Sequence, residues 1–110
     1  MKRLFVYGSL QLGGSNEKVL TDIGGEWQRG SVRGRLHEAG WGADLGYPGL
    51  VLDETGNEVP GFVFSSPHLD QHWPELDEFE GEEYERVTTW VTLEDGGGRV
   101  EAEVYSIRQS

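Results

Sequence analysis

Two segments of the sequence hold residues whose types and spacing could do chemistry on a small molecule. The first runs from Leu4 to Leu10, where a short apolar stretch is interrupted by Gly8 and Ser9. Because glycine adopts backbone angles that a Cβ would forbid, several consecutive N–H groups can point outward here. Such N–H groups form a concave site for a carboxylate or phosphate. An ordinary turn after a strand explains the same residues, so this segment alone leaves both interpretations open.

The second segment is acidic and contains one glutamate in an unusual position. Leu76, Phe79 and Glu80 are spaced by three and four residues, so they share one face of a predicted helix. Contact with apolar surface raises the pKa of a carboxyl group, which suits proton transfer near neutral pH. Glu80 is therefore the candidate catalytic residue. In the alternative interpretation, Glu80 ends the helix at Gly81 and bends out to solvent.

The neighbouring charged residues are predicted to have simpler roles. Asp77 and Glu78 point away from the apolar face of the helix and are expected to face water. Arg86 could orient a carboxylate, or it could pair with one of the glutamates nearby. The second role is favoured, because glutamates surround it in the sequence.

The elements that must position these segments are mostly short strands. Strands are predicted at residues 3–7, 31–37, 50–52, 61–64, 87–93 and 99–107, with the last two forming a hairpin. Alternation in 31–37 places Val32, Gly34 and Leu36 inward. Because strands dominate and helices fall between them, a small β-barrel with an inserted helical segment fits this order better than a βαβ sandwich.

Helical segments are predicted at two places in the chain. Residues 16–20 have weak helical character. A longer helix is predicted to start at a serine cap, Ser65–Ser66, with Pro67 in its first turn. Since a proline inside a helix removes a hydrogen bond and clashes with the preceding turn, Pro74 is predicted to begin a separate short helix.

Composition limits the classes of function. A chain of 110 residues is long enough for one domain, residues 1–110, with a single modest core. The net charge of −11 argues against nucleic acid or an anionic membrane as a partner. The sequence contains no cysteine, which excludes thiolate catalysis and Cys-ligated zinc. With no apolar run of membrane-spanning length and no leader before the first strand, a cytoplasmic protein is expected.

A metal site was the strongest competing signal for chemistry. His68 and His72 are spaced for one helix face and could bind a metal together with Asp70. Pro74 follows at once and the helix is short, so the sequence predicts no metal site and no cofactor.

The two chemical segments, in this order, resemble the γ-glutamylcyclotransferase-like family. The resemblance is carried by Val6-Tyr7-Gly8-Ser9-Leu10 and by Leu76-Asp77-x-Phe79-Glu80-Gly81-x-x-Tyr84-x-Arg86. Further matches follow the expected order: Gly34-Arg35-Leu36, Tyr47-Pro48-Gly49, Gly61-Phe62-Val63-Phe64 and Val104-Tyr105. The resemblance spans nearly the whole chain and is greatest to compact members, including the γ-glutamylamine cyclotransferases.

This resemblance implies an α+β fold, a small mixed β-barrel with short inserted helices (the γ-glutamylcyclotransferase-like fold). It also implies that the Tyr7, Gly8, Ser9 and Leu10 turn binds the α-carboxylate of a γ-glutamyl group, while Glu80 acts as acid and base. Tyr84 and Tyr105 match recurrent tyrosines of the family, and their role is either substrate binding or packing in the barrel wall. The chain departs from the family at Glu17, where a histidine is frequent, and in a longer loop at 38–46 that carries Trp41.

The chemistry implied is cyclisation of a γ-glutamyl compound to 5-oxoproline. The α-amine of the substrate attacks its own γ-carbonyl, and one carboxylate near neutrality can move the proton to the departing amine. The expected partner is thus a small-molecule γ-glutamyl substrate, and γ-glutamylamines, or γ-glutamyl amino acids with an extended side chain, are expected to be preferred to glutathione. The alternative is a non-catalytic module that holds a small carboxylate metabolite at the Tyr7–Leu10 turn. No feature of the sequence indicates an oligomeric state.

Overall fold

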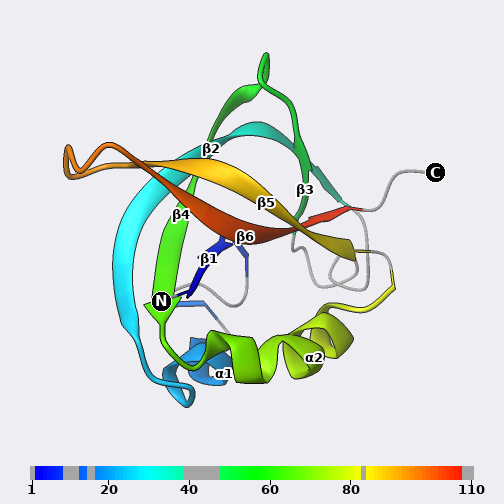
Figure 1. Ribbon diagram of the computed structural model, residues 1–110. Coiled ribbons are helices and arrows are strands. Elements are labelled where there is room, and N and C mark those ends of the chain that lie inside the picture. Colours follow the sequence, from blue (N-terminus) through cyan, green and yellow to red (C-terminus); the bar gives the residue numbers. More distant parts are fainter. Residues whose placement is uncertain (1, 9–12, 15–16, 39–47, 83, 108–110) are drawn as a thin grey trace.

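The computed structural model describes residues 2–8, 13–14, 17–38, 48–82 and 84–107. These residues form six strands and two helices (Figure 1). The strands are β1 (Lys2–Val6), β2 (Glu26–Glu38), β3 (Pro48–Leu52), β4 (Asn57–Ser66), β5 (Tyr84–Leu93) and β6 (Arg99–Ile107). The helices are α1 (Glu17–Thr21) and α2 (Leu69–Glu80).

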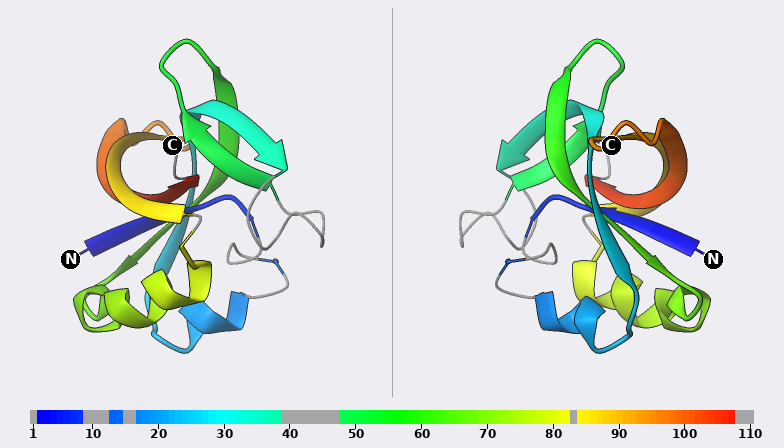
Figure 2. Two further views of the ribbon diagram at one scale, coloured as in Figure 1. Left: turned by 90° about the vertical axis from the view of Figure 1, so that its right-hand side faces the viewer. Right: turned by 90° about the vertical axis from the view of Figure 1, so that its left-hand side faces the viewer.

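All six strands belong to one closed, mixed sheet. The strand order is β1–β4–β2–β3–β6–β5, and the additional pairings of β1 with β6 and of β2 with β5 close it. The β1–β6 and β3–β6 pairings are parallel, whereas the others are antiparallel. Figures 1 and 2 show α1 and α2 together at one end of the closed sheet. The predicted small mixed β-barrel with short inserted helices is confirmed.

Buried apolar side chains form two clusters. The helix-side cluster combines residues of the helices with residues of the strands: Leu4, Val6, Leu20, Phe64, Leu69, Trp73, Leu76, Tyr84 and Tyr105. The strand cluster contains residues of strands only: Phe5, Val32, Leu50, Val59, Val63, Val91, Leu93, Ala102 and Val104. Strand β1 contributes to both clusters, because successive side chains of a strand point to opposite faces.

One close approach between β1 and β4 depends on a glycine. A Cβ added at Gly61 would collide with the Val6 carbonyl oxygen and would lie 2.7 Å from the Phe5 ring. Val6 pairs with Phe62, the residue that follows Gly61. The absence of a side chain at this position therefore lets the Phe5 ring pack against β4 inside the strand cluster.

The prediction of two short helices separated at Pro74 is wrong. The chain forms one continuous helix, α2, with Pro74 inside it and with Leu69, Trp73 and Leu76 buried. An internal proline costs a helix about 3 kcal/mol. Burial of each large apolar side chain contributes about 1.5–3 kcal/mol, so packing of this face outweighs the local penalty.

The predicted serine cap of α2 is also wrong, although Ser66 still contacts the start of the helix. Ser66 belongs to β4, and His68 occupies the N-cap position without a side-chain hydrogen bond to the helix. The Ser66 hydroxyl accepts a hydrogen bond from the His68 N–H (3.1 Å) and donates one to the Gly24 carbonyl (2.6 Å). It thereby joins the start of α2 to the segment that precedes β2.

Strand β2 is longer than predicted and its alternation is only partly confirmed. It begins at Glu26, and its first part pairs with β4 while its last part pairs with β3. Val32 and Gly34 are buried as predicted, but Leu36 is 47% exposed. Among the residues whose burial is described, the alternation therefore ends at Gly34, and Val32 is the only β2 member of the strand cluster.

Candidate active site

Tyr7 follows directly after β1 and fastens it to two other strands. Its hydroxyl donates a hydrogen bond to the Tyr105 carbonyl (2.7 Å) and accepts one from the Leu50 N–H (3.0 Å). Burial raises the pKa of the Tyr7 phenol strongly; the hydrogen bond from Leu50 opposes this rise and the nearby Glu80 carboxylate adds to it. Tyr7 is therefore a neutral phenol that holds the end of β1 against β3 and β6.

Gly8 lies beside Tyr7 at the start of the predicted anion-binding turn. It is not among the glycines with a positive φ, and an added Cβ would meet nothing within 4 Å. The expectation that Gly8 takes a backbone angle forbidden to other residues is therefore wrong. Among the described residues, no backbone angle and no neighbouring atom requires a glycine at this position. Ser9 and Leu10, the rest of the predicted turn, lie outside the described residues.

Glu80 is the last residue of α2, and its side chain is only partly exposed. Leu76 on the same face is fully buried and Phe79 is half-buried, as their spacing predicted. Burial raises the pKa of Glu80 to about 7. The carboxylate is also near enough to raise the pKa of Tyr7 and, as a smaller contribution, that of Tyr105. These facts do not fit a side chain that has turned out to solvent.

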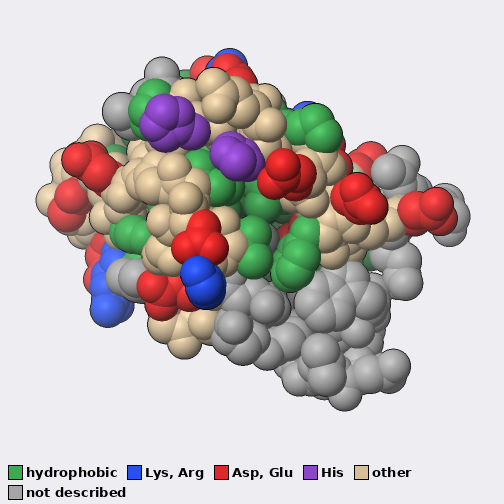
Figure 3. All heavy atoms as spheres, turned by 90° about the horizontal axis from the view of Figure 1, so that it is seen from below, with side chains coloured by type: hydrophobic (Ala, Val, Ile, Leu, Met, Phe, Trp, Pro, Cys, Tyr) green, Lys and Arg blue, Asp and Glu red, His purple; other side chains and the backbone are tan. Residues whose placement is uncertain are grey.

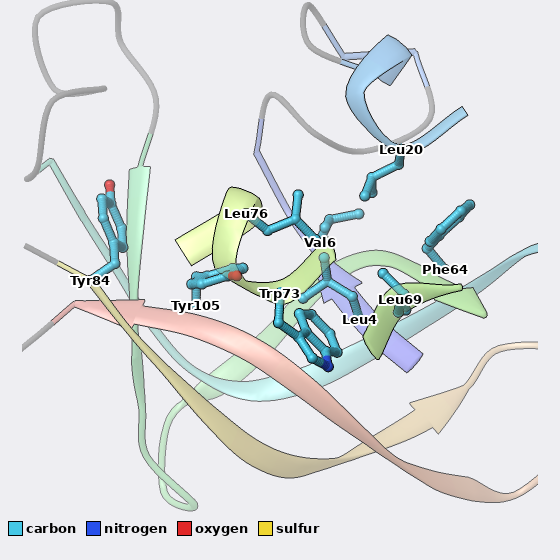
Figure 4. Packing of buried hydrophobic residues seen from close by; sticks show 9 residues of the cluster. All are labelled: Leu4, Val6, Leu20, Phe64, Leu69, Trp73, Leu76, Tyr84 and Tyr105. Atoms are coloured by element: carbon cyan, nitrogen blue, oxygen red, sulfur yellow. The ribbon is translucent and has the colours of Figure 1, made fainter. Parts of the chain in front are cut away.

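Tyr105 carries a hydrogen-bond network that the sequence analysis missed. Its hydroxyl donates to Asp77 Oδ1 at 2.7 Å, and Arg86 Nε lies 3.3 Å from the same oxygen. The Arg86 guanidinium stacks over the Trp73 ring, with its carbon 4.3 Å from the ring centre. Figure 4 shows Tyr105 next to Trp73 and Leu76 of α2. The network thus connects α2 to strands β5 and β6.

One prediction about this segment is confirmed in part and another is corrected. Asp77 is exposed as predicted, but its carboxylate also binds Tyr105 and Arg86. The ion pair found for Arg86 is with Asp77 rather than with one of the flanking glutamates. The sequence signal that could have indicated this is the spacing of Trp73 and Asp77, which places both on one side of the helix at i and i+4. Their partners, Arg86 and Tyr105, come from strands, so helical periodicity could not identify them.

Tyr84 and Tyr105 are both buried in the helix-side cluster, and both line a pocket of about 570 Å³. Gly81, which follows Glu80, also lines this pocket. The remaining lining residues are charged: Asp77, Glu78, Glu82, Glu85 and Arg86. The packing role of both tyrosines is therefore confirmed, while substrate binding by either one stays a prediction. The pocket has an acidic rim next to the C-terminal end of α2.

The described residues include no group of three His, Cys, Asp or Glu side chains placed to hold a metal ion. His72 Nδ1 instead lies 3.2 Å from Glu75 Oε2 on the same helix.

None of the helices in the described part of the chain is long and apolar enough to cross a membrane. Trp41 of the longer loop and Tyr47 of the Tyr47-Pro48-Gly49 match lie outside the described residues.

The face of the molecule that carries both helices is shown in Figure 3. Apolar side chains are visible near its centre, with acidic side chains to their left and right. A groove of about 350 Å³ between α1 and α2 is lined by Val19, Ile23, Leu76 and Phe79 together with Asp22, His72 and Glu75. Leu76 and Phe79, which line this groove, also belong to the apolar helix face that carries Glu80.

Comparison with known proteins places this geometry in context. The model of the family described as "Gamma-glutamyl cyclotransferase, AIG2-like" matches residues 4–110. AIG2-like protein A of Arabidopsis thaliana is 34% identical over 113 residues, which cover 96% of this chain and 61% of that protein. The chain thus spans about 61% of the length of this curated relative.

Solved structures of similar proteins share the fold. The crystal structure of an AIG2-like protein from Mus musculus matches with a TM-score of 0.76 and 28% identity, covering 100% of this chain and 79% of that chain. The solution structure of At5g39720.1 from Arabidopsis thaliana matches with a TM-score of 0.70 and 31% identity, covering 96% of this chain and 68% of that chain.

Proposed function

Because the chain belongs to the γ-glutamyl cyclotransferase, AIG2-like family, we propose that it cyclises a γ-glutamyl amine or γ-glutamyl amino acid to 5-oxoproline and releases the amine. The observation that supports this most directly is the pKa of about 7 that burial gives Glu80. A carboxyl group with this pKa exists in both protonation states near neutral pH. It can therefore both accept and return a proton during one turnover.

In the proposed reaction the substrate supplies its own nucleophile. Glu80 takes a proton from the α-ammonium, and the freed amine attacks the γ-carbonyl carbon to form the new C–N bond of the ring. The old C–N bond to the leaving amine then breaks, and Glu80 returns its proton to that nitrogen. Glu80, deprotonated again, then takes the second surplus proton from the α-nitrogen and passes it to the released amine. The α-nitrogen thus loses two protons and the leaving amine gains two, so the reaction needs no oxidant, reductant or water.

The proposed binding site for the α-carboxylate is the Tyr7–Leu10 turn, of which the structure describes Tyr7 and Gly8. The space next to the Gly8 Cα is open, so a ligand can approach the backbone closely. Tyr7, the preceding residue, is held firmly by β3 and β6 and lies within electrostatic range of Glu80. This arrangement supports a substrate whose carboxylate lies at the turn and whose γ-amide lies near Glu80.

The charges around the acidic pocket favour a leaving group without a carboxylate. Four acids line this pocket: Asp77, Glu78, Glu82 and Glu85. Arg86, the base among its lining residues, is engaged by Asp77 and by the Trp73 ring. A carboxylate on the leaving group would therefore meet net repulsion, whereas a plain or cationic amine would not. We accordingly favour γ-glutamylamines over glutathione as substrates.

Substitution of the proposed proton carrier tests the reaction. Glu80→Gln keeps the size of the side chain but cannot carry a proton, so kcat/KM should fall about a hundredfold or more. The measurement is 5-oxoproline release from γ-glutamylamines, γ-glutamyl amino acids and glutathione. Near-normal turnover by the variant would remove Glu80 from the mechanism. Saturable binding without turnover by the unmodified protein would instead support a non-catalytic carboxylate-binding module.

Substitution of Gly8 tests the proposed carboxylate site. Since an added Cβ meets no other atom of the described chain within 4 Å, Gly8→Ala should leave the midpoint of urea unfolding nearly unchanged. The methyl group should nevertheless hinder the approach of the carboxylate and raise KM about tenfold, with a smaller change in kcat. Gly61→Ala is the matched control, because its Cβ would collide with β1 and lower stability instead. An unchanged KM in Gly8→Ala would place the carboxylate elsewhere.

A further inference from the structure

Strand β5 has one side that is paired along its whole length and one side that is mostly unpaired. On the first side it pairs with β6 over residues 84–92. On the second side it pairs with β2, but only at Thr92 and Leu93. Among the described residues no other strand pairs with this second side. The edge of β5 is therefore open over residues 86–91.

The hydrogen-bond register shows which backbone groups face this open edge. In an antiparallel pair, successive residues direct their N–H and C=O groups to opposite sides. The Leu93 N–H donates to the Gly98 carbonyl (2.8 Å) across the hairpin, so the odd-numbered residues of β5 face β6. The N–H and C=O groups of Arg86, Thr88 and Trp90 therefore point to the open edge.

An open edge of this kind is suited to pairing with another extended chain. Unpaired N–H and C=O groups of an edge strand are a template for an added strand. Thr88 and Trp90 are exposed, and Arg86 is half-buried. Edge strands are commonly protected by proline or lysine, and β5 contains neither. The backbone of β5 is thus able to accept a partner strand here.

A groove of about 540 Å³, the Trp90 groove, lies beside the C-terminal half of this edge. Its lining comes from both strands: Ser31, Val32 and Arg33 of β2, and Thr89, Trp90 and Thr92 of β5. It is therefore located where β2 and β5 diverge. The Trp90 side chain is 54% exposed, so its ring offers apolar surface to a side chain of an added strand.

The other end of the open edge lies beside the acidic pocket. Glu85 and Arg86 of β5 line this pocket together with Asp77, Glu78 and Glu82. Because Arg86 forms an ion pair with Asp77, carboxylates remain in excess among these residues. A basic side chain at this end of an added strand would be attracted, and an acidic one would be repelled.

The charges in the Trp90 groove favour the same kind of partner. Three acids and two bases line it: Asp53, Glu54, Glu58, Arg33 and Arg99. Arg33 donates to the Gly56 carbonyl, and the Arg99 guanidinium lies 5.5 Å from the centre of the Trp90 ring. Both bases are therefore already engaged. The net charge of −11 attracts a basic partner over a longer range and opposes a second copy of the chain.

We infer that the open edge of β5 is a docking site for an extended, basic segment of a partner protein. Such a segment would exchange main-chain hydrogen bonds with Arg86, Thr88 and Trp90. It would place an apolar side chain on the Trp90 ring and a lysine or arginine at the acidic pocket. Arg86 to Trp90 span about 13 Å at about 3.3 Å per residue, so a short segment is long enough. The inference concerns binding and does not rest on the proposed reaction.

Three nine-residue peptides test the inference on the full, unmodified chain. Each peptide has five central residues of alternating threonine and valine, with acetylated and amidated ends. The first has two lysines on each side, the second has glutamates instead, and the third is the lysine peptide with N-methylated central residues. Fluorescence anisotropy at low ionic strength measures their affinities. The lysine peptide should bind about tenfold more tightly than the others, because glutamates are repelled and N-methyl groups block strand pairing.

Amide hydrogen exchange identifies the edge that the peptide uses. With the lysine peptide at about ten times its dissociation constant, exchange at Arg86, Thr88 and Trp90 should slow about tenfold. The N–H groups of Val87 and Thr89 face β6, so their exchange should change little and serves as an internal control.

The first pair of variants changes one N–H group of the open edge. Thr88→Pro removes an N–H that does not bond to β6, a position where an edge strand tolerates proline. Thr88→Ala is the matched control, because it loses the same hydroxyl bond to Glu103 but keeps the N–H. Affinity for the lysine peptide should fall about fivefold or more in Thr88→Pro and by less than about twofold in Thr88→Ala.

The second pair of variants changes exposed apolar surface. Trp90→Ala should weaken binding of the lysine peptide about tenfold. Leu36→Ala is its control, because Leu36 is also exposed but does not line the Trp90 groove. It should change the affinity by less than about twofold.

Four results would overturn the inference. Equal binding of the lysine and N-methylated peptides would show a purely electrostatic contact. Equal binding of the lysine and glutamate peptides, or no binding of the lysine peptide at millimolar concentration, would exclude a basic partner strand. A dimer in sedimentation velocity that Thr88→Pro abolishes would assign the edge to a second copy of the chain. If Thr88→Pro fails to fold, the N-methylated peptide and hydrogen exchange decide the question on the unmodified chain.

Discussion

The two apolar clusters of this small protein differ in what lies beside them. The strand cluster consists of aliphatic side chains and one phenylalanine, contributed entirely by strands. The helix-side cluster contains a tryptophan and two tyrosines, and the partly buried Glu80 lies next to it at the end of α2. Among the described residues that are not exposed, no buried polar side-chain atom lacks a hydrogen bond. The strand cluster thus contributes only to stability. The helix-side cluster also holds polar groups in fixed directions.

This difference shows that the two faces of one strand can have different roles. Phe5 of β1 points into the strand cluster, whereas Leu4 and Val6 point toward the helices. On the side of β1 that carries Phe5, every buried methylene group adds to the free energy of unfolding. On the helix side, the raised pKa of Glu80 means that its charged form is disfavoured by the fold, so a group suited to proton transfer lowers stability at neutral and alkaline pH.

The largest change in stability is expected from truncation inside the strand cluster. Phe5 is 1% exposed, so Phe5→Ala would leave a cavity that the surrounding strands fill only in part. Substitutions of this kind cost about 3–5 kcal/mol. Urea unfolding at pH 7 would measure the loss as a lower midpoint. A loss below 1 kcal/mol would mean that the strand cluster is not the main source of stability.

A stability change of opposite sign is expected from Glu80→Gln. The folded state raises the pKa of Glu80 from 4.5 to about 7, so between these values the folded protein holds a proton that the unfolded chain has released. Stability therefore falls as pH rises through this range, by about 1.4 kcal/mol per pH unit and about 3 kcal/mol in total. Glutamine removes this cost, so the variant should be more stable than the parent at pH 8.

Urea unfolding at two pH values checks this prediction. The gain in stability from Glu80→Gln should be about 3 kcal/mol at pH 8 and clearly smaller at pH 5.5, where less of the charge penalty has developed. Glu78→Gln, on the exposed side of the same helix, is a control that should show no such pH-dependent gain. A variant that is less stable than the parent at pH 8 would contradict the raised pKa.

A smaller effect is expected from Tyr7→Phe, which removes the hydroxyl that joins three strands. The Leu50 N–H and the Tyr105 carbonyl would each lose this partner. Loss of such hydrogen bonds in a half-buried setting should lower the free energy of unfolding by about 2 kcal/mol. Tyr105→Phe removes only the bond to Asp77, so it should cost less. Equal losses in the two variants would show that the strand contacts of Tyr7 contribute nothing beyond a single bond.

Elements with clear local signals were well predicted from the sequence. The hairpin of β5 and β6 follows from alternating residues on both sides of a glycine-rich turn, and the pairing is antiparallel as predicted. Leu76, Phe79 and Glu80 were correctly assigned to one helix face, because helical periodicity is a property of the chain alone. Because that face is apolar and packs toward the core, the sequence also predicts that Glu80 is partly buried.

Errors arose where tertiary packing opposes a local preference. The continuity of α2 through Pro74 depends on Leu69, Trp73 and Leu76, which pack against strands distant in the sequence. Leu36, which alternation places inward, is 47% exposed. No local rule contains this information, because it depends on where other elements end.

The sequence by itself determined the family, the mixed barrel and the one glutamate that lies on an apolar helix face. Each of these follows from residue type, order or period along the chain. Only the tertiary structure decided that Tyr7 bonds to β3 and β6 and that Asp77, Arg86 and Tyr105 form one network. The physical reason is that hydrogen-bond partners are chosen by distance and direction in space. Tyr7 and Tyr105 are 98 residues apart in the chain. The parallel pairing of β1 with β6 nevertheless brings the Tyr7 hydroxyl to 2.7 Å from the Tyr105 carbonyl oxygen.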